Sequence, residues 1–152
     1  MVASVIILVI STLLFLYWFR YTCLLILNTK TSVDYTSEVA SANQLEFPRV
    51  QSEIPSAARD KLDGLQGALD RDFQHLKVLL DRTACVEVDA DSTEEIVLRL
   101  DYSAMRLIYN LSRRFSNSLA RRSLSEMSLI VAHFANTFGD RTAAAPVPIR
   151  SS

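Results

Sequence analysis

The sequence has few of the residues that make tight turns, with three glycines and four prolines in 152 residues. A sandwich or barrel of many short strands needs turn formers about every 8 to 12 residues, so both classes of fold are excluded. Two cysteines, Cys23 and Cys85, are too few for a disulfide framework. Neither histidine is followed at i+3 or i+4 by a residue that forms a metal-binding pair, and no cluster of Cys or His is present, so we expect no metal site and no cofactor. These absences favour an all-α protein.

Charge is absent from the N-terminal region. No charged side chain precedes Arg20, and 22 of the first 27 residues are apolar. At about 1.5 Å per residue, a helix of this length covers close to the roughly 30 Å hydrocarbon layer of a bilayer. We therefore predict a transmembrane helix in residues 1–28, with membrane lipid around residues 2–27. Four side chains at its end are predicted to anchor it at the membrane interface: Tyr17, Trp18, Arg20 and Tyr21.

A cleaved secretory signal is the main alternative to a retained helix. It is disfavoured because no basic residue precedes the apolar run, and because the run exceeds the usual length of about 7 to 15 residues. Arg20 and Lys30 follow the run, which favours an N-terminus outside and a C-terminal domain in the cytoplasm. Cys23, close to the predicted membrane, fits an inert thiol better than an acylation site.

The rest of the chain is predicted to form a connector, a small three-helix bundle and a disordered tail. The connector, residues 29–55, has room for a short helix at 34–45 and an extended stretch at 45–48, because Pro48 disfavours helix in the residue before it. The bundle covers residues 56–139, with helices at 56–83, 92–120 and 123–138. The tail covers residues 140–152.

Apolar residues recur at helical spacing in this bundle. The first helix carries a narrow stripe of Leu62, Leu65, Leu69, Phe73, Leu76 and Leu80. The second carries Val97, Leu100, Ala104, Ile108, Leu111, Phe115 and Leu119. This second stripe is widened by Leu98, Tyr102, Met105 and Tyr109. Because the combined apolar arc of the second helix exceeds half its circumference, we predict that this helix is the central one.

Two capping-box patterns predict where these helices begin. Ser92 with Glu95 is expected to start the second helix, and Ser123 with Glu126 the third. Gly139 is expected to cap the third helix at its C-terminus. An uninterrupted helix over residues 92–138 remains the alternative, because no glycine or proline enforces a break. In the first helix, Gly64 and Gly67 are interpreted as a place where another helix approaches closely.

Charge is unevenly divided between the two halves of the chain. Residues 31–95 hold 14 acidic and 6 basic side chains, and residues 96–152 hold 3 acidic and 8 basic ones. We expect the acidic first helix to pack against the basic second and third. A basic surface for anionic lipid, formed by Arg113, Arg114, Arg121 and Arg122, is the alternative. Arg99, Arg106 and Arg113 lie opposite the second apolar stripe and are interpreted as a solvated face. No nucleic-acid-binding pattern is present.

Asp101 is the one polar residue inside the apolar arc of the second helix. A buried carboxylate needs a partner, and Arg59, Lys61 or Lys77 could supply one from the first helix. We favour a structural ion pair. A proton-handling or ligand-binding role for Asp101 is the alternative.

Two short segments carry a family resemblance. Residues 42–48 read Ala-Asn-Gln-Leu-Glu-Phe-Pro, and residues 133–141 read His-Phe-Ala-Asn-Thr-Phe-Gly-Asp-Arg. Together with the N-terminal apolar helix, they resemble a group of uncharacterised bacterial single-span membrane proteins of the acidobacterial kind. The resemblance implies the same architecture and a bacterial inner membrane, and it implies no site residue.

The sequence favours a structural or interaction function. We expect a single-pass protein whose helical domain holds a protein partner, or a second copy of itself, beside the membrane. The alternative is an accessory module that binds lipid or a small ligand through its basic C-terminal helices. We expect no enzyme, because the sequence has no glycine-rich phosphate loop, no nucleophile elbow and no convergent pair of acid and base.

Overall fold

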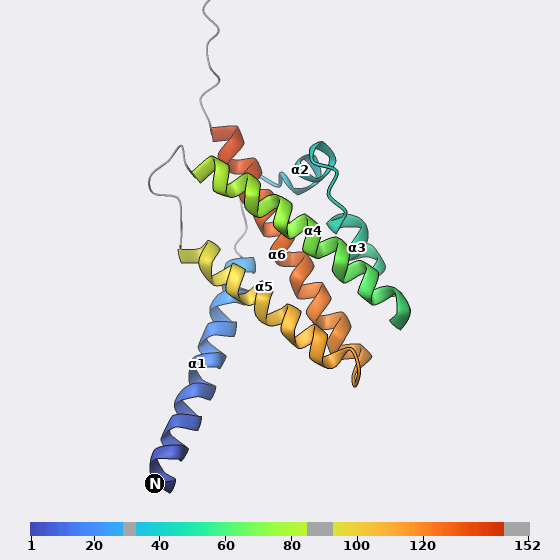
Figure 1. The fold of residues 1–152 in the computed structure, drawn as a ribbon. Helices are drawn as coiled ribbons and strands as arrows, with labels where there is room; N and C mark the ends of the chain where they lie inside the picture. The colour runs from blue at the N-terminus through green and yellow to red at the C-terminus, as the bar shows by residue number, and fades with distance from the viewer. Residues whose placement is uncertain (29–32, 85–92, 145–152) are drawn as a thin grey trace, which may run out of the picture.

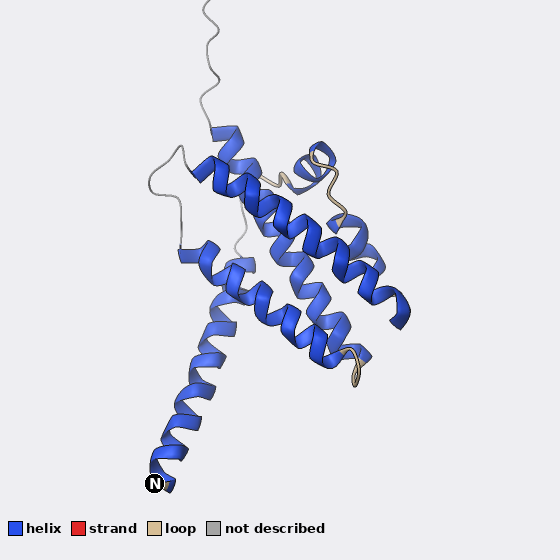
Figure 2. Cartoon of the chain, in the orientation of Figure 1, coloured by secondary structure: helices blue, strands red, loops and turns tan. Residues whose placement is uncertain are grey.

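A computed structural model describes residues 1–28, 33–84 and 93–144, and these form six α-helices with no strand among them (Figures 1 and 2). The helices are α1 (Val2–Asn28), α2 (Thr36–Ala42), α3 (Phe47–Glu53), α4 (Arg59–Ala84), α5 (Thr93–Ser112) and α6 (Asn117–Ala144). The all-α class is confirmed. The three-helix bundle is not confirmed: α2 lies within the short helix predicted at 34–45, α3 is an additional helix, and both contribute to the core.

The first helix projects away from the other five (Figure 1). Among the residues the structure describes, α1 is the one helix long and apolar enough to cross a membrane. Its side chains are exposed from Met1 to Trp18, and burial begins only near its C-terminal end, where Cys23 is fully enclosed. We call the rest of the structure, α2 to α6, the helical body.

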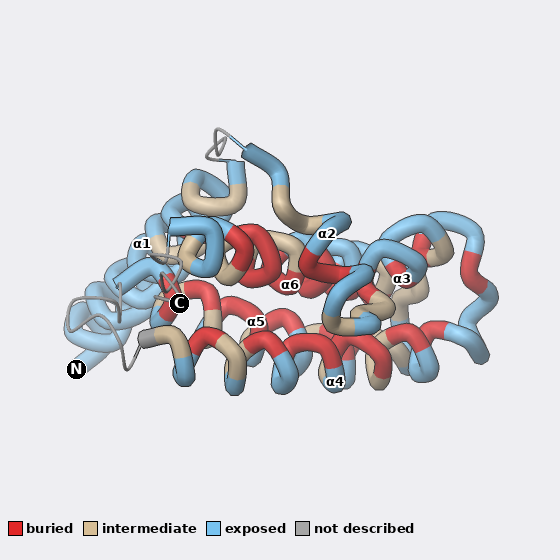
Figure 3. The backbone as a smooth tube through the Cα atoms, turned by 90° about the horizontal axis from the view of Figure 1, so that it is seen from above, coloured by how far each residue is buried: buried red, intermediate tan, exposed pale blue. Residues whose placement is uncertain are grey.

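The centre of the helical body is α6. Figure 3 shows its buried stretch between α5, α4 and the short helices, and α2, α3, α4 and α5 all pack against it. Its buried apolar residues occupy several faces: Ala120, Leu124, Met127, Ile130, Val131, Phe134 and Ala135. The expectation that the helix at 92–120 is central is therefore wrong, because small residues such as Ala120 and Ala135 let neighbouring helices approach α6 from more than one side.

The apolar stripe predicted for the first long helix is confirmed in α4. All six of its members are buried, and α4 begins three residues later than predicted, since the turn at residues 54–56 and the non-helical residues 57–58 precede it. The interpretation of Gly64 and Gly67 is wrong, because no atom lies within 4 Å of a Cβ placed on either glycine.

The break between α5 and α6 lies at residues 113–116, not at 121–123 as predicted. The Ser116 side chain accepts a hydrogen bond from the Leu119 amide at 3.4 Å and so caps α6. Ser123 lies inside α6, where its hydroxyl donates to the Leu119 carbonyl at 3.0 Å. Neither the predicted start at Ser123 nor the uninterrupted helix is correct.

The connector is helical where an extended stretch was predicted. Pro48 lies in the first turn of α3, a position at which proline costs no hydrogen bond. The Asp72 carboxylate from α4 accepts hydrogen bonds from the amides of Glu46 and Phe47 at 2.7 and 2.6 Å. Burial raises the pKa of Asp72, although these two amides oppose the rise. A carboxylate distant in sequence therefore caps α3.

Gly139 lies inside α6 rather than at its end. A Cβ at this position would collide with the Cβ of Tyr35 and lie 3.2 Å from Cγ2 of Val39. Tyr35 is held there by its amide, which donates to Oδ1 of Asn136 at 2.8 Å. Glycine is therefore required for α2 to pack on α6, and the predicted cap at Gly139 is wrong.

Two predictions fall partly or wholly outside the described residues. The Ser92 cap lies there, as do residues 145–152 of the predicted tail. The described part of that tail, residues 140–144, belongs to α6.

Replacing Gly139 tests the packing of α2 on α6. We expect Gly139→Ala to lower the free energy of unfolding by about 1 to 3 kcal/mol, because the added methyl group overpacks the contact with Tyr35. Gly64→Ala is the matched control, and should stabilise the protein by up to about 1 kcal/mol through helix propensity alone. Thermal unfolding of the full chain in detergent measures both. Equal shifts for the two variants would contradict the packing.

Candidate functional site

The junction between α1 and the helical body is built on one arginine. Nη1 of Arg20 donates to Oδ1 of Asp101 in α5 at 2.7 Å, and Nη2 donates to Oε2 of Glu126 in α6. The planar guanidinium can bridge two carboxylates because its donors point in fixed, divergent directions. Arg20 therefore connects three helices.

Apolar contacts surround this ion-pair group. The Cys23 side chain, one turn further along α1, is fully buried and its thiol hydrogen bonds to Asp101. Ile26 and Leu27 pack against the core of the helical body. The last two turns of α1 are thus part of the folded domain, which agrees with an inert rather than an acylated Cys23.

Asp101 is buried, as predicted, with 1% of its side chain exposed. The predicted partners are wrong. Arg59 instead donates from Nε to the Arg113 carbonyl at 3.1 Å, and the actual partner of Asp101 is Arg20. Burial raises the pKa of Asp101, and the nearby guanidinium opposes this rise. Sequence reasoning missed Arg20 because its position after an apolar run favours a lipid-facing role.

A ladder of ion pairs joins α4 to α5. Arg113 pairs with Asp63 at 3.0 Å, Arg106 with Asp70 at 3.1 Å, and Arg99 with Asp81 at 2.7 Å. The acidic partners follow one another from Asp63 to Asp81 along α4, while their basic partners run in the reverse order, from Arg113 just after α5 back to Arg99. This order is the pattern of two antiparallel helices. The acidic helix α4 packs against α6, and its carboxylates pair with these arginines, so the expectation that the acidic first helix packs against the basic second and third is confirmed. The interpretation of Arg99, Arg106 and Arg113 as a solvated face holds in part, because Arg106 and Arg113 remain 52% and 40% exposed, but each of the three also pairs with a carboxylate of α4.

Two tyrosines reinforce this ladder from the buried side. The Tyr109 hydroxyl donates to Asp63 at 2.7 Å, and the Tyr102 hydroxyl donates to Asp70 at 2.9 Å. Tyr102 also stacks on Phe73 of α4 with ring centroids 3.8 Å apart. The Tyr109 hydrogen bond and then Arg113 hold the pKa of Asp63 below its usual value. Burial raises the pKa of both tyrosines, so their hydroxyls remain donors.

The ladder determines which face of α5 is buried. The enclosed side chains are Leu98, Tyr102, Met105 and Tyr109. The stripe predicted to be the core instead lies at the edge of the body or outside it, with Leu100, Leu111, Phe115 and Leu119 exposed. The predicted rotation of α5 is therefore wrong, since its arginines need the carboxylates of α4.

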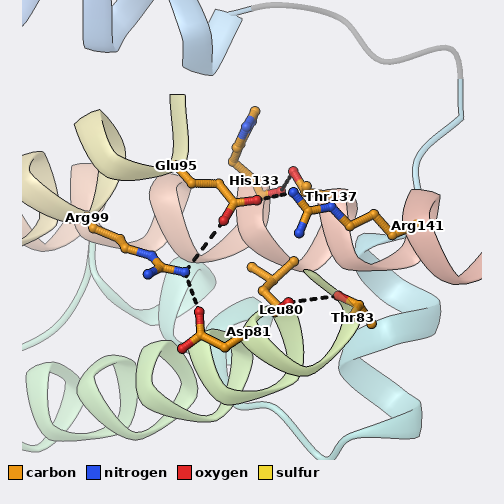
Figure 4. Close-up of polar contacts among 8 residues, drawn as sticks. All are labelled: Leu80, Asp81, Thr83, Glu95, Arg99, His133, Thr137 and Arg141. Carbon is orange, nitrogen blue, oxygen red and sulfur yellow. Dashed lines mark hydrogen bonds and ion pairs between the residues drawn. The ribbon is translucent and has the colours of Figure 1, made fainter. Parts of the chain in front are cut away.

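A second ionic group lies at the N-terminal end of α5, where it continues from the Arg99–Asp81 pair of the ladder (Figure 4). Glu95 is buried and lies between Arg99, at 3.5 Å, and Arg141 of α6, while Arg99 also reaches Asp81. The ring of His133 points away from these groups in Figure 4, and burial lowers its pKa. Among the described residues, no group of three or more His, Cys, Asp or Glu side chains could hold a metal ion.

Two of the four arginines predicted to contact anionic lipid are engaged within the chain. Arg113 pairs with Asp63, and Arg121 donates to the carbonyls of Pro55 and Ala57 at 3.2 and 2.7 Å. Arg121 therefore holds the turn before α4. Arg114 and Arg122 are exposed, and Arg122 also pairs with Glu126 at 3.4 Å.

The other predicted interface anchors are exposed on α1. Tyr17, Trp18 and Tyr21 form a consecutive aromatic group, with ring centroids 6.4 and 5.9 Å apart in edge-to-face geometry. Arg20 differs from them, because its charge meets carboxylates of the helical body.

Comparison of the chain with protein-family models, with curated proteins and with solved structures finds no match.

Replacing Arg20 tests the junction. In Arg20→Met the pKa of Asp101 should rise further above its value in the unfolded chain, because the opposing positive charge is gone. The folded state then holds the proton more tightly than the unfolded state. The free energy of unfolding of the variant is therefore retained at pH values below the pKa that Asp101 has in the unfolded chain. It falls as the pH rises through the pKa that Asp101 has in the folded protein. We expect a cost of about 3 kcal/mol at pH 8 and a smaller one at pH 5, measured by thermal unfolding in detergent.

A second substitution separates the charge effect from lost packing. Arg20→Met with Asp101→Asn should recover most of the deficit at pH 8, because the buried group is then neutral. Arg122→Met is the matched control, since Arg122 is exposed and pairs with the same Glu126. A deficit that is independent of pH, or one that Asn does not reduce, would contradict the assignment.

Proposed function

We propose that this protein is a single-pass membrane protein whose helical body is an interaction or scaffold module held beside the membrane. The observation that carries this proposal is the Arg20 bridge to Asp101 and Glu126, because it attaches the body directly to the end of the apolar helix. The N-terminus lies outside and the body lies in the cytoplasm, at a bacterial inner membrane.

The exposed surface of α1 supports the membrane span. Large apolar side chains from Val2 to Leu16 are uncovered on all sides of the helix. Burying each such side chain is worth roughly 1.5 to 3 kcal/mol, so water is a poor environment for this helix. A bilayer covers all sides at once, and the aromatic group of Tyr17, Trp18 and Tyr21 then lies at headgroup level.

The pairing of the carboxylates supports binding rather than catalysis. A general acid or base must contact a substrate. Each carboxylate at the Arg20 junction, in the Glu95 group and in the α4–α5 ladder instead pairs with an arginine of the same chain. These carboxylates are Asp63, Asp70, Asp81, Glu95, Asp101 and Glu126. We accordingly propose a protein partner or a second copy, and no enzymatic activity.

A lipid- or small-ligand-binding accessory role is the second candidate. The exposure of Arg114 and Arg122 favours it, since both side chains are available to anionic headgroups. Arg113 and Arg121 are already engaged within the chain, which weakens this alternative.

Photo-crosslinking in intact bacterial cells tests the interaction role. A photoreactive amino acid replaces exposed residues of the full-length, C-terminally tagged protein, one at a time, with Glu38 on α2 and His75 on α4 as first positions. We expect a crosslinked product of defined mass from positions clustered on one face. Its mass distinguishes a second copy from another protein.

The same tag provides the topology control. It should resist protease added to spheroplasts and be digested after lysis. Digestion before lysis would overturn the orientation, and a scan of all exposed positions without any protein adduct would overturn the scaffold role.

A further inference from the structure

A wide apolar surface lies on the side of α5 that faces away from the core. Its exposed members, the outer face of α5, are Ile96, Leu100, Leu107, Leu111 and, in the following turn, Phe115. Their exposed fractions range from 48% for Ile96 to 84% for Phe115. At 100° per residue, the sector from Ile96 to Ile108 spans about 120° and contains no charged residue of α5. Surface helices of soluble domains rarely leave such a sector uncovered.

The position of this face relative to α1 is set by the junction. Asp101, near the middle of α5, lies 2.7 Å from Arg20 of α1. The 19 residues before Arg20 span roughly 28 Å as a helix, close to the thickness of the hydrocarbon layer. When α1 crosses a bilayer, Arg20 reaches the headgroup boundary and brings the middle of α5 to the same depth.

The orientation of α5 agrees with this depth. Figure 1 shows α5 crossing the C-terminal end of α1, with the projecting part of α1 and α4 on opposite sides of α5. The core-facing side of α5 packs against α6 and bonds to α4. Its opposite side is therefore turned toward the half-space into which α1 projects.

Cationic residues border this face. Arg114 lies two residues beyond the end of α5, and the side chain of Arg122 is 76% exposed beside a pocket of about 220 Å³ that Arg20, Ile108 and Leu119 also line. An apolar sector bordered by arginines is the arrangement of helices that lie in a membrane interface.

We propose that the outer face of α5 is seated in the headgroup and acyl boundary of the bilayer leaflet from which α1 emerges. This inference depends on the proposed membrane span. The protein then has two membrane contacts, a spanning helix and a helix in the plane of the interface, and the bilayer orients the helical body. Lipid is favoured over a second copy because the Arg20 contact already holds this face at the membrane surface.

Depth-dependent quenching tests the proposal. Trp18 is the only tryptophan in the sequence, so Trp18→Phe with Leu107→Trp reports from the outer face alone. His75→Trp in the same background is the matched control, since His75 is exposed on α4. The full-length proteins are reconstituted into phosphatidylcholine and phosphatidylglycerol vesicles, with or without lipid brominated in the upper acyl chain.

We expect blue-shifted emission from the tryptophan at position 107, quenched about twofold by brominated lipid, because interfacial helices bury their apolar face by roughly 5 to 10 Å. The control at position 75 should emit as in water and remain unquenched. Leu111→Trp provides a second position on the outer face, and an unchanged melting temperature shows that each variant is folded.

Three results would overturn the proposal in distinguishable ways. Emission as in water at positions 107 and 111, with Trp18 of the unmodified protein still quenched, leaves the span intact and removes the lipid contact. Blue-shifted emission without quenching assigns the outer face to a second copy or another protein. An unquenched Trp18 removes the span itself, and with it this inference.

Discussion

The bridge from Arg20 to Asp101 and Glu126 is the interaction on which the rest of the arrangement depends. A buried carboxylate is costly without a charged or hydrogen-bonding partner, and Asp101 has 1% of its side chain exposed. Among the described residues, Arg20 of α1 is the cation that pairs with it, so the buried charge is compensated when the apolar helix is docked. The same contact determines where the body lies along α1, and therefore which surfaces the proposed span would bring next to a membrane.

Charge also determines how α5 is rotated about its axis. Its apolar residues cover more than half of the circumference, so hydrophobic burial alone could direct either of two faces inward. Arg99, Arg106 and Arg113 meet Asp81, Asp70 and Asp63 only in the observed rotation. The ladder thereby leaves the outer face of α5 uncovered, and the proposed lipid contact is a consequence of pairing on the opposite side.

Local patterns in the sequence correctly predicted those features that depend on a single helix. The stripe of α4 is narrow and one-sided, so its burial followed from spacing, and Asp101 was predicted to be buried from its angle on α5. The predictions failed for features that depend on contacts between several helices. In the sequence, Ser123 with Glu126 fits a capping box as well as Ser116 fits an N-cap. The structure differs because Glu126 pairs with Arg20 rather than with the backbone amide of Ser123, and Ser116 caps α6 instead. Gly139 resembles a helix end, but it is needed for the contact with Tyr35.

We infer that α1 and the helical body form one rigid unit in a bilayer, joined through Arg20. The most direct measurement is the distribution of distances between spin labels at Val5→Cys on α1 and His75→Cys on α4. The protein is held in lipid nanodiscs, with Cys23 and Cys85 replaced by serine. We expect a single narrow distribution that broadens in Arg20→Met, because the ion pairs that hold α1 to the body are then lost. A broad distribution with Arg20 present would show that the body moves freely at the end of α1, and would contradict this inference.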